Sequence, residues 1–316
     1  MDAFTTIPEN AARQFIDSMS VYESFRRANT EARKVQGGMY WKQQGDYCYL
    51  VKTMPDNRQR RIGARSAETE AVFEKFMRRK NDAEMRLASL KVALRDAERL
   101  NKALRVGRTP TLVVALLQAL DETGLSEHFT VVGTHALYAY ERAAGVRIVQ
   151  SALATQDVDL LWDARRRVQF MATMATLDTS VLSVLQRVDA SFRRRDDQLC
   201  TAVNDKGFEV DFLRRILQED DPHPFRLSAD EDDLWPVQAA RADVLTQAPR
   251  FEHIVVSTTG RMALMRTVAP ETFVEFKNWM ARKALNRPAM KRRRDAQQSA
   301  IVQTLLDENL LIERHG

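Results

Sequence analysis

The sequence predicts an α/β (α+β) protein in which a mixed sheet is flanked by helices. Short apolar strands alternate with helices between residues 110 and 215, which is typical of a sheet covered by helices. A group of short strands and a long heptad-patterned helix precede this stretch, and the pattern is helical again from about residue 262. We therefore expect an N-terminal accessory region over 1–108, a core over 109–260, and a helical region over 261–316 that completes a cleft with the core.

The composition is that of an ordinary globular chain. Its 316 residues carry 48 Lys+Arg and 43 Asp+Glu, which gives a net charge of +5, and 44% of the residues are hydrophobic. Two cysteines are too few for a disulfide scaffold or a cysteine-based zinc site. The first ten residues lack the features of a signal peptide, and the longest apolar block, 111–120, is too short to span a bilayer. We expect a soluble, cytoplasmic protein without a membrane association.

The N-terminal region is predicted to open with a helix followed by a small meander. Apolar side chains at spacings of three and four predict the helix within residues 9–36, and two glycines end it. Three short strands, separated by turn signals, are then expected at 39–41, 47–51 and 58–62. This piece carries no visible catalytic residues.

A long helix is predicted over residues 66–106. Ser66 is a good N-cap, and apolar positions repeat every three or four residues from Phe73 to Leu104, as in a coiled coil. This seam needs a partner, which is either the 9–36 helix folding back or a second chain. The outer face of the helix is basic, and we favour a solvated face over one that grips RNA.

Six elements are expected in order along the core. They are a helix at 111–122, a strand at 129–132, a helix at 135–144, a strand at 157–162, a helix at 164–177 and a strand at 208–213.

A Gly-Thr turn follows the first of these strands. Gly133-Thr134 leads from the strand into a helix, and backbone N–H groups at such a turn are free to hold a phosphate. The signal is not specific by itself, because many strand-to-helix turns contain Gly. His135 comes next, and we favour a histidine satisfied by its neighbours over a nucleotide contact.

Two predicted strands carry carboxylates among apolar residues. Asp157 and Asp159 are two positions apart on one strand, so both side chains point to the same face. Such carboxylates repel each other unless a cation neutralises them, and oxygen ligands suit Mg²⁺ or Mn²⁺. The later strand places Glu209 and Asp211 on one face in the same way. Asp211 is preferred as the third ligand because apolar residues follow it, as they follow Asp159, and Glu209 is the substitute.

These parts together resemble the polymerase-β-type nucleotidyltransferase fold. Its signature is a Gly-Ser or Gly-Thr turn opening a helix, a strand with Asp-x-Asp, and a third acidic residue on a neighbouring strand. The matching positions are Gly133, Thr134, Asp157, Asp159 and Asp211. The chain is most similar to a bacterial branch of stand-alone nucleotidyltransferases related to toxin and abortive-infection proteins. The sequence departs from the pattern in the long gap between the turn and Asp157, so residues 146–155 are expected to form a loop beside the site.

The resemblance implies two-metal chemistry. Asp157 and Asp159 would bridge two Mg²⁺ or Mn²⁺ ions about 3.5–4 Å apart, and Asp211 would share one of them. Gly133 and Thr134 would contact the phosphates of an NTP such as ATP. The reaction would be in-line attack of an acceptor hydroxyl on the α-phosphate, with pyrophosphate leaving.

Three basic residues are candidates for further phosphate contacts. Lys277 lies near the apolar face of a predicted helix, where it is either a phosphate contact or a lysine that reaches out to solvent. Arg293 and Arg294 belong to a cationic run, Lys291-Arg292-Arg293-Arg294, and are candidate phosphate or acceptor contacts.

The leading hypothesis is therefore an NMP transferase acting on RNA, such as a tRNA, or on a protein. Basic clusters at 193–195 and 291–294 favour RNA. A toxin or phage-defence role, with an antitoxin or a second copy bound to the 66–106 helix, comes from the resemblance alone. The alternative is a catalytically idle fold that binds RNA or protein.

Overall fold

The computed structural model describes most of the chain, namely residues 3–54, 57–218, 221, 225–284 and 287–311. The chain divides into two compact units, a smaller one of Arg13–Leu104 and a larger one of Met1–Ala12 with Arg105–Gly316. The three region boundaries expected from the sequence stay predictions.

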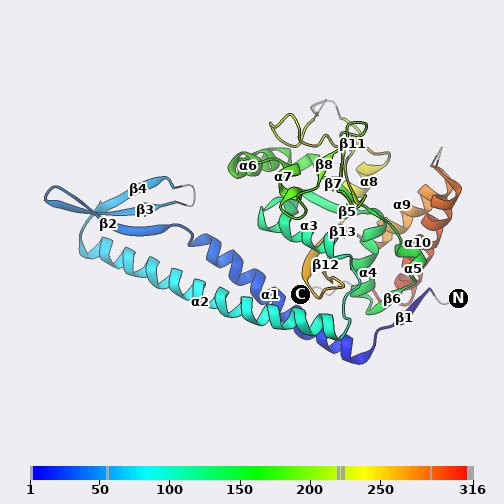
Figure 1. Cartoon of the computed structure of the whole chain (residues 1–316), viewed down its shortest axis with the longest axis horizontal. Helices are drawn as coiled ribbons and strands as arrows, with labels where there is room; N and C mark the ends of the chain where they lie inside the picture. Colours follow the sequence, from blue (N-terminus) through cyan, green and yellow to red (C-terminus); the bar gives the residue numbers. More distant parts are fainter. Residues whose placement is uncertain (1–2, 55–56, 219–220, 222–224, 285–286, 312–316) are drawn as a thin grey trace. The chain divides into compact units, whose positions relative to one another are not determined.

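The smaller unit is a pair of helices joined through a three-stranded meander (Figure 1). Its elements are α1 (Glu9–Lys34), which begins one turn before the unit does, β2 (Gly38–Gln44), β3 (Tyr47–Thr53), β4 (Gln59–Ala64) and α2 (Ala67–Ala103). The strands pair antiparallel in the order β2-β3-β4. The helices and the meander confirm the expectation from the sequence.

The predicted seam of α2 is covered within the smaller unit. Ala97 and Asn101 are buried, and Gln14 of α1 donates its Nε2 to Asn101 Oδ1 at 3.2 Å. Near the start of α2, the ring of Phe73 lies 5.8 Å from that of Trp41 in β2. The seam therefore packs against α1 and the meander, and a second chain bound to this helix stays a prediction.

The larger unit contains a mixed sheet with helices around it (Figure 1). Its helices are α3 (Thr111–Glu122), α4 (Leu137–Ala143), α5 (Gln150–Leu153), α6 (Arg167–Leu177), α7 (Val181–Gln186), α8 (Ala242–Gln247), α9 (Pro270–Arg282) and α10 (Ala289–Asp307), with 3₁₀ turns η1 (Leu125–His128), η2 (Gly133–Ala136) and η3 (Ala164–Arg166). Its strands are β1 (Phe4–Thr6), β5 (Phe129–Val132), β6 (Val146–Ile148), β7 (Asp157–Trp162), β8 (Arg193–Arg194), β9 (Thr201–Val203), β10 (Glu209–Arg214), β11 (Val237–Gln238), β12 (Arg250–Val256) and β13 (Met262–Val268).

The main sheet has the order β5-β7-β10-β9-β8, with β11 beside β10. Strands β7 and β10 run parallel, whereas β5 and β9 run antiparallel to their neighbours, so the sheet is mixed as predicted. In the parallel pair, Asp211 stands opposite Asp159. The alternate positions of both strands are buried apolar residues, Val158, Leu160, Val210 and Phe212. Burial of that face fixes the register, and the register brings the carboxylates together.

Two segments differ from the expectation. Residues 262–268 form strand β13 instead of a helix, because they pair along their whole length with β12. Residues 146–155 are not a plain loop: β6 pairs with β1, and the turn α5 follows. Strand β6 gains its structure from a partner far away in the sequence, whereas β13 forms a hairpin with β12, the strand just before it.

Among the helices that the structure describes, none is both long and apolar enough to cross a membrane.

Candidate active site

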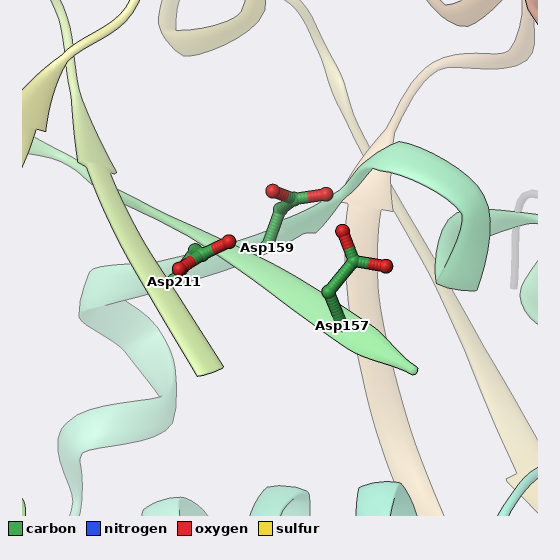
Figure 2. A group of neighbouring side chains, drawn as sticks. All are labelled: Asp157, Asp159 and Asp211. Carbon is green, nitrogen blue, oxygen red and sulfur yellow. The ribbon is translucent and has the colours of Figure 1, made fainter. Parts of the chain in front are cut away.

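Three carboxylates meet on one face of the main sheet. Asp157 and Asp159 project from β7 and Asp211 from β10, and Figure 2 shows their side chains gathered on the two adjacent strands. One oxygen atom from each residue lies within 4.8 Å of the oxygens of the other two. All three are half-buried. The sequence predicted this trio, and the parallel register of β7 and β10 brings it together.

Gly133 closes one side of the trio. It begins η2 directly after β5 with a φ of +70°, a conformation that L side chains rarely adopt. A Cβ built on it would lie only 2.2 Å from Asp159 Oδ2. A glycine is therefore required here both for the turn and for the close approach of the Asp159 carboxylate.

The electrostatic environment opposes ionisation of two of the three carboxylates. Burial, together with the charges of Asp157 and Asp211, raises the pKa of Asp159 to about 7. Burial also raises the pKa of Asp211, against the effect of Thr201, whose Oγ1 donates a hydrogen bond to Asp211 Oδ1 at 2.5 Å. The cluster therefore holds more negative charge than its surroundings neutralise.

Glu209, the substitute ligand, is engaged elsewhere. It stands opposite Asp157 in the sheet register, but its Oε1 accepts a hydrogen bond from Arg195 Nη1 at 2.7 Å. Arg195 also forms a forked pair with Asp197. The structure thus places Asp211, and not Glu209, with Asp157 and Asp159.

Lys277 lies inside the protein, between the carboxylates and a second acidic residue. Its Nζ donates to Asp295 Oδ1 at 2.9 Å, and Arg287 donates to the other oxygen of Asp295. Lys277 is only 5% exposed, and Asp295 is fully buried. Burial lowers the pKa of Lys277, while Asp295 and Asp159 counteract that effect. Conversely, the Lys277 and Arg287 charges favour the ionised form of Asp159.

This buried pair rules out one of the two alternatives for Lys277, and the phosphate contact stays a prediction. A lysine that reaches out to solvent is wrong, because the ammonium is enclosed and bound to Asp295. Sequence reasoning missed the role of Arg287 altogether. Asp295 directly follows the Lys291–Arg294 cationic run, but no sequence motif assigned it a partner.

Hydrogen bonds from Gln298 link Thr134 to the segment before β7. Gln298 of α10 donates its Nε2 to Thr134 Oγ1 at 3.1 Å and to the Ala152 carbonyl at 2.7 Å. Thr155, just beyond, donates its hydroxyl to Asp157 Oδ1. The 146–155 segment therefore orients one of the three carboxylates, and Gln298 is a residue that no sequence motif singled out.

The two predicted arginines separate. Arg294 Nη1 donates to the Ala154 carbonyl at 2.8 Å, next to Thr155. Arg293 is exposed and lines a groove between α9 and α10, together with Arg282 and Arg292. None of the three aspartates lines that groove, so Arg293 is not part of the same cluster.

His135 is buried next to Asp157. Its side chain is 1% exposed and packs against the rings of Tyr138 and Phe208. Burial lowers the pKa of His135 to about 4, while the charge of Asp157 and a hydrogen bond to its backbone act in the opposite direction. It is therefore a neutral packing residue beneath the site.

A cavity of about 600 Å³ lies on the Asp211 side of the trio. Asp211 and Thr201 are among its lining residues, and Leu199, Trp235 and Val237 provide apolar walls. The Gly133 turn follows β5, which is on the other side of β7 from β10 and this cavity. A ligand in the cavity and a ligand at the turn would approach the carboxylates from opposite sides.

The donor set fits a hard divalent cation. It consists of carboxylate oxygens only, which are the ligands that Mg²⁺ and Mn²⁺ prefer. A bound cation would relieve the mutual repulsion that raises the pKa of Asp159.

Comparison with known proteins agrees with this geometry. The model of a nucleotidyltransferase family matches residues 111–314, nearly two thirds of the chain and all of the residues just described. No curated protein matches the chain, and no solved structure does. The match includes β7, β10, the Gly133 turn and the helices α9 and α10. The chain belongs to this nucleotidyltransferase family.

Proposed function

We propose that this protein transfers an NMP from an NTP to a hydroxyl group of an acceptor, with release of pyrophosphate. The observation that carries the proposal is the trio Asp157, Asp159 and Asp211, whose oxygens lie within 4.8 Å of one another on two register-matched strands. Membership of a nucleotidyltransferase family supports it. An idle binding module would have no need to keep three mutually repelling carboxylates half-buried.

The three aspartates would hold divalent metal, Mg²⁺ or Mn²⁺. When bound, the metal supplies positive charge to the triphosphate and lowers the pKa of the acceptor hydroxyl. Asp157 and Asp159, on the same face of β7, would coordinate the cation from one strand, and Asp211 would coordinate it from β10. Asp211 borders the cavity, so it is also the carboxylate nearest to an incoming acceptor.

The Gly133 turn would receive the triphosphate. Thr134 already accepts a hydrogen bond from Gln298, so its own hydroxyl proton remains to donate to a phosphate oxygen. Arg294, next to the Thr155 segment, is the nearer of the two predicted arginines to this side. Lys277 acts on the Asp159 carboxylate: its buried ammonium partly balances the cluster and is itself held in place by Asp295.

The acceptor end would occupy the cavity beside Asp211. Its volume of about 600 Å³ and its walls of Leu199 and Trp235 suit a flat, partly apolar group such as a nucleoside. This favours an RNA end, such as that of a tRNA, over a protein hydroxyl. A toxin or phage-defence role rests on the resemblance alone and forms no part of the proposal.

Incubation of the protein with each labelled NTP, Mg²⁺ and either total RNA or total protein tests the proposal. We expect label in one pool, with the RNA pool favoured, and a drop of at least about 100-fold in Asp157→Ala and Asp159→Ala. The matched control is Asp307→Ala, which removes an exposed carboxylate at the end of α10.

Three results would contradict it. Label in neither pool would favour the idle binding module. Full activity in both aspartate variants would remove these residues from the chemistry. Equal loss in Asp307→Ala would indicate a general effect on folding, which a thermal melt of each variant measures directly.

A further inference from the structure

The meander presents an uncovered sheet face rich in tyrosine. Tyr40 and Lys42 of β2, Tyr47 and Tyr49 of β3, and Arg61 of β4 form what we call the tyrosine face. Tyr47 is 64% exposed and Tyr40 is 37% exposed. The face holds three of the six tyrosines of the chain, so it is an unusual concentration of aromatic surface.

The strand register puts these side chains on one side of the sheet. Tyr40 stands opposite Val51, which stands opposite Arg61, and Lys42 stands opposite Tyr49. Cross-strand partners and alternate residues along a strand share a face. The guanidinium of Arg61 lies over the ring of Tyr49. Aromatic and cationic groups are thus interleaved.

The opposite side of the meander is already occupied. Trp41 stands opposite Leu50, which is fully buried, and the Trp41 ring contacts Phe73 of α2. The meander therefore packs on its own helix through one side, and the tyrosine face is the side turned away from that contact. Its rings contact one another and Arg61 instead of α2, so their outer surfaces are open to a ligand.

Charge indicates the kind of ligand. Residues 38–65 have a net charge of +4, from Lys42, Lys52, Arg58, Arg60, Arg61 and Arg65 against Asp46 and Asp56. Of these cations, Lys42 and Arg61 lie on the tyrosine face, whereas Lys52 and Arg65 lie over Phe76 and Trp41 on the side that faces α2. A polyanion with flat rings matches both properties: phosphates pair with the cations and unstacked bases lie on the tyrosines. A duplex would hide its bases, and an acidic peptide would not use the rings.

We infer that the tyrosine face binds single-stranded RNA through base stacking and phosphate pairing. The inference goes beyond nucleotidyl transfer and does not require it. Binding here is sequence-tolerant, because every base offers a π-face to a tyrosine ring.

Fluorescence anisotropy of the full chain with a labelled single-stranded RNA of about 12 nucleotides tests the inference. The assay contains no NTP and no Mg²⁺, so its result is independent of catalysis. Tyr47→Ala is expected to weaken binding about tenfold through lost stacking. Lys42→Gln with Arg61→Gln should reduce the slope of log Kd against log salt concentration by about 1.4, since each single-strand phosphate contributes about 0.7.

The control is Lys91→Gln with Arg95→Gln, which removes the same charge from the exposed outer face of α2. Unchanged affinity in this pair supports the tyrosine face. An equal loss in this pair would indicate diffuse attraction to the outer helix and would overturn the inference. Absence of RNA binding, or equal binding of duplex RNA with no effect of Tyr47→Ala, would overturn it as well.

Discussion

The two units of the protein differ in whether they contain a fully enclosed ion pair among the described residues. In the larger unit, Lys277 of α9 and Asp295 of α10 are enclosed and paired with each other across two helices. In the smaller unit, ion pairs such as Arg99 with Asp96 join near neighbours on exposed helix faces. A buried charge must be balanced by a specific partner, whereas an exposed charge is balanced by water. The larger unit therefore holds charged side chains in fixed positions beside the candidate site, whereas the charged side chains of these pairs in the smaller unit are exposed to solvent.

Removal of a buried partner should have the largest effect. Asp295→Asn leaves the Lys277 ammonium without its counter-charge, so we expect the free energy of unfolding to fall by about 3–5 kcal/mol. Asp96→Asn, which breaks the exposed pair in the smaller unit, should cost less than about 1 kcal/mol. Urea denaturation measures both values. Similar costs for the two variants would show that the contrast between the units is wrong.

The glycine turn provides the next comparison. Gly133 and Gly45 both have positive φ, but a Cβ at Gly45 would meet no atom within 4 Å, whereas one at Gly133 would collide with Asp159. Both alanine variants should lose about 1–2 kcal/mol from backbone strain. Only Gly133→Ala should also lower the rate of nucleotidyl transfer, by about 100-fold, because it displaces a carboxylate. Transfer that survives Gly133→Ala would remove Asp159 from its assigned role.

A pH dependence of stability should appear in the metal-free protein. The pKa of Asp159 is raised to about 7, so between about pH 4 and 7 the folded chain keeps a proton that the unfolded chain has lost. The contribution of Asp159 to the free energy of unfolding is at its maximum below the pKa of the unfolded state. It is lost as the pH rises through the folded-state pKa of about 7. Asp159→Asn cannot ionise, so it should avoid this loss. At pH 8 we expect its free energy of unfolding to exceed that of the unmodified chain by about 1–2 kcal/mol, after allowance for solvent screening.

The same titration separates metal binding from protonation. Added Mg²⁺ should stabilise the unmodified chain at pH 8 and have a much smaller effect on Asp159→Asn. Thermal melts at pH 5 and pH 8, with and without Mg²⁺, provide the measurement. A stability that stays constant across this range in the metal-free chain would contradict the assignment.

The smallest expected effect is local to the smaller unit. Ser66 accepts a hydrogen bond from Thr69 N at the start of α2, and the Thr69 hydroxyl accepts one from Ser66 N. Ser66→Ala should cost about 1 kcal/mol and should speed hydrogen exchange in the first turn of α2. Nucleotidyl transfer should not change, and a loss of transfer would show that the units are coupled.

Local pattern was enough to predict the elements of the smaller unit. The glycine pair, the turn signals and Ser66 mark where its helices and strands begin and end, and the heptad seam marks the packed face of α2. Local pattern also placed Asp157 and Asp159 on one face of a strand. Each of these predictions depends on residues that are close together in the chain.

Other parts of the site needed the tertiary structure. The sequence left Asp211 and Glu209 as alternatives, and the β7–β10 register together with the Arg195 pair separated them. The link from Lys277 through Asp295 to Arg287 joins two helices, and Gln298 reaches back to Thr134 across more than 160 residues.

The sequence by itself thus determined the fold class, the Asp157–Asp159 pair and the Gly-Thr turn, because strand alternation and turn chemistry are local properties of a chain. Only the tertiary structure decided which residue completes the acidic cluster, which charges balance it, and that residues 146–148 form a strand. Those outcomes depend on which distant segments pack together. An unpaired buried charge or strand edge costs free energy, and this cost selects one arrangement among several that fit the sequence pattern equally well.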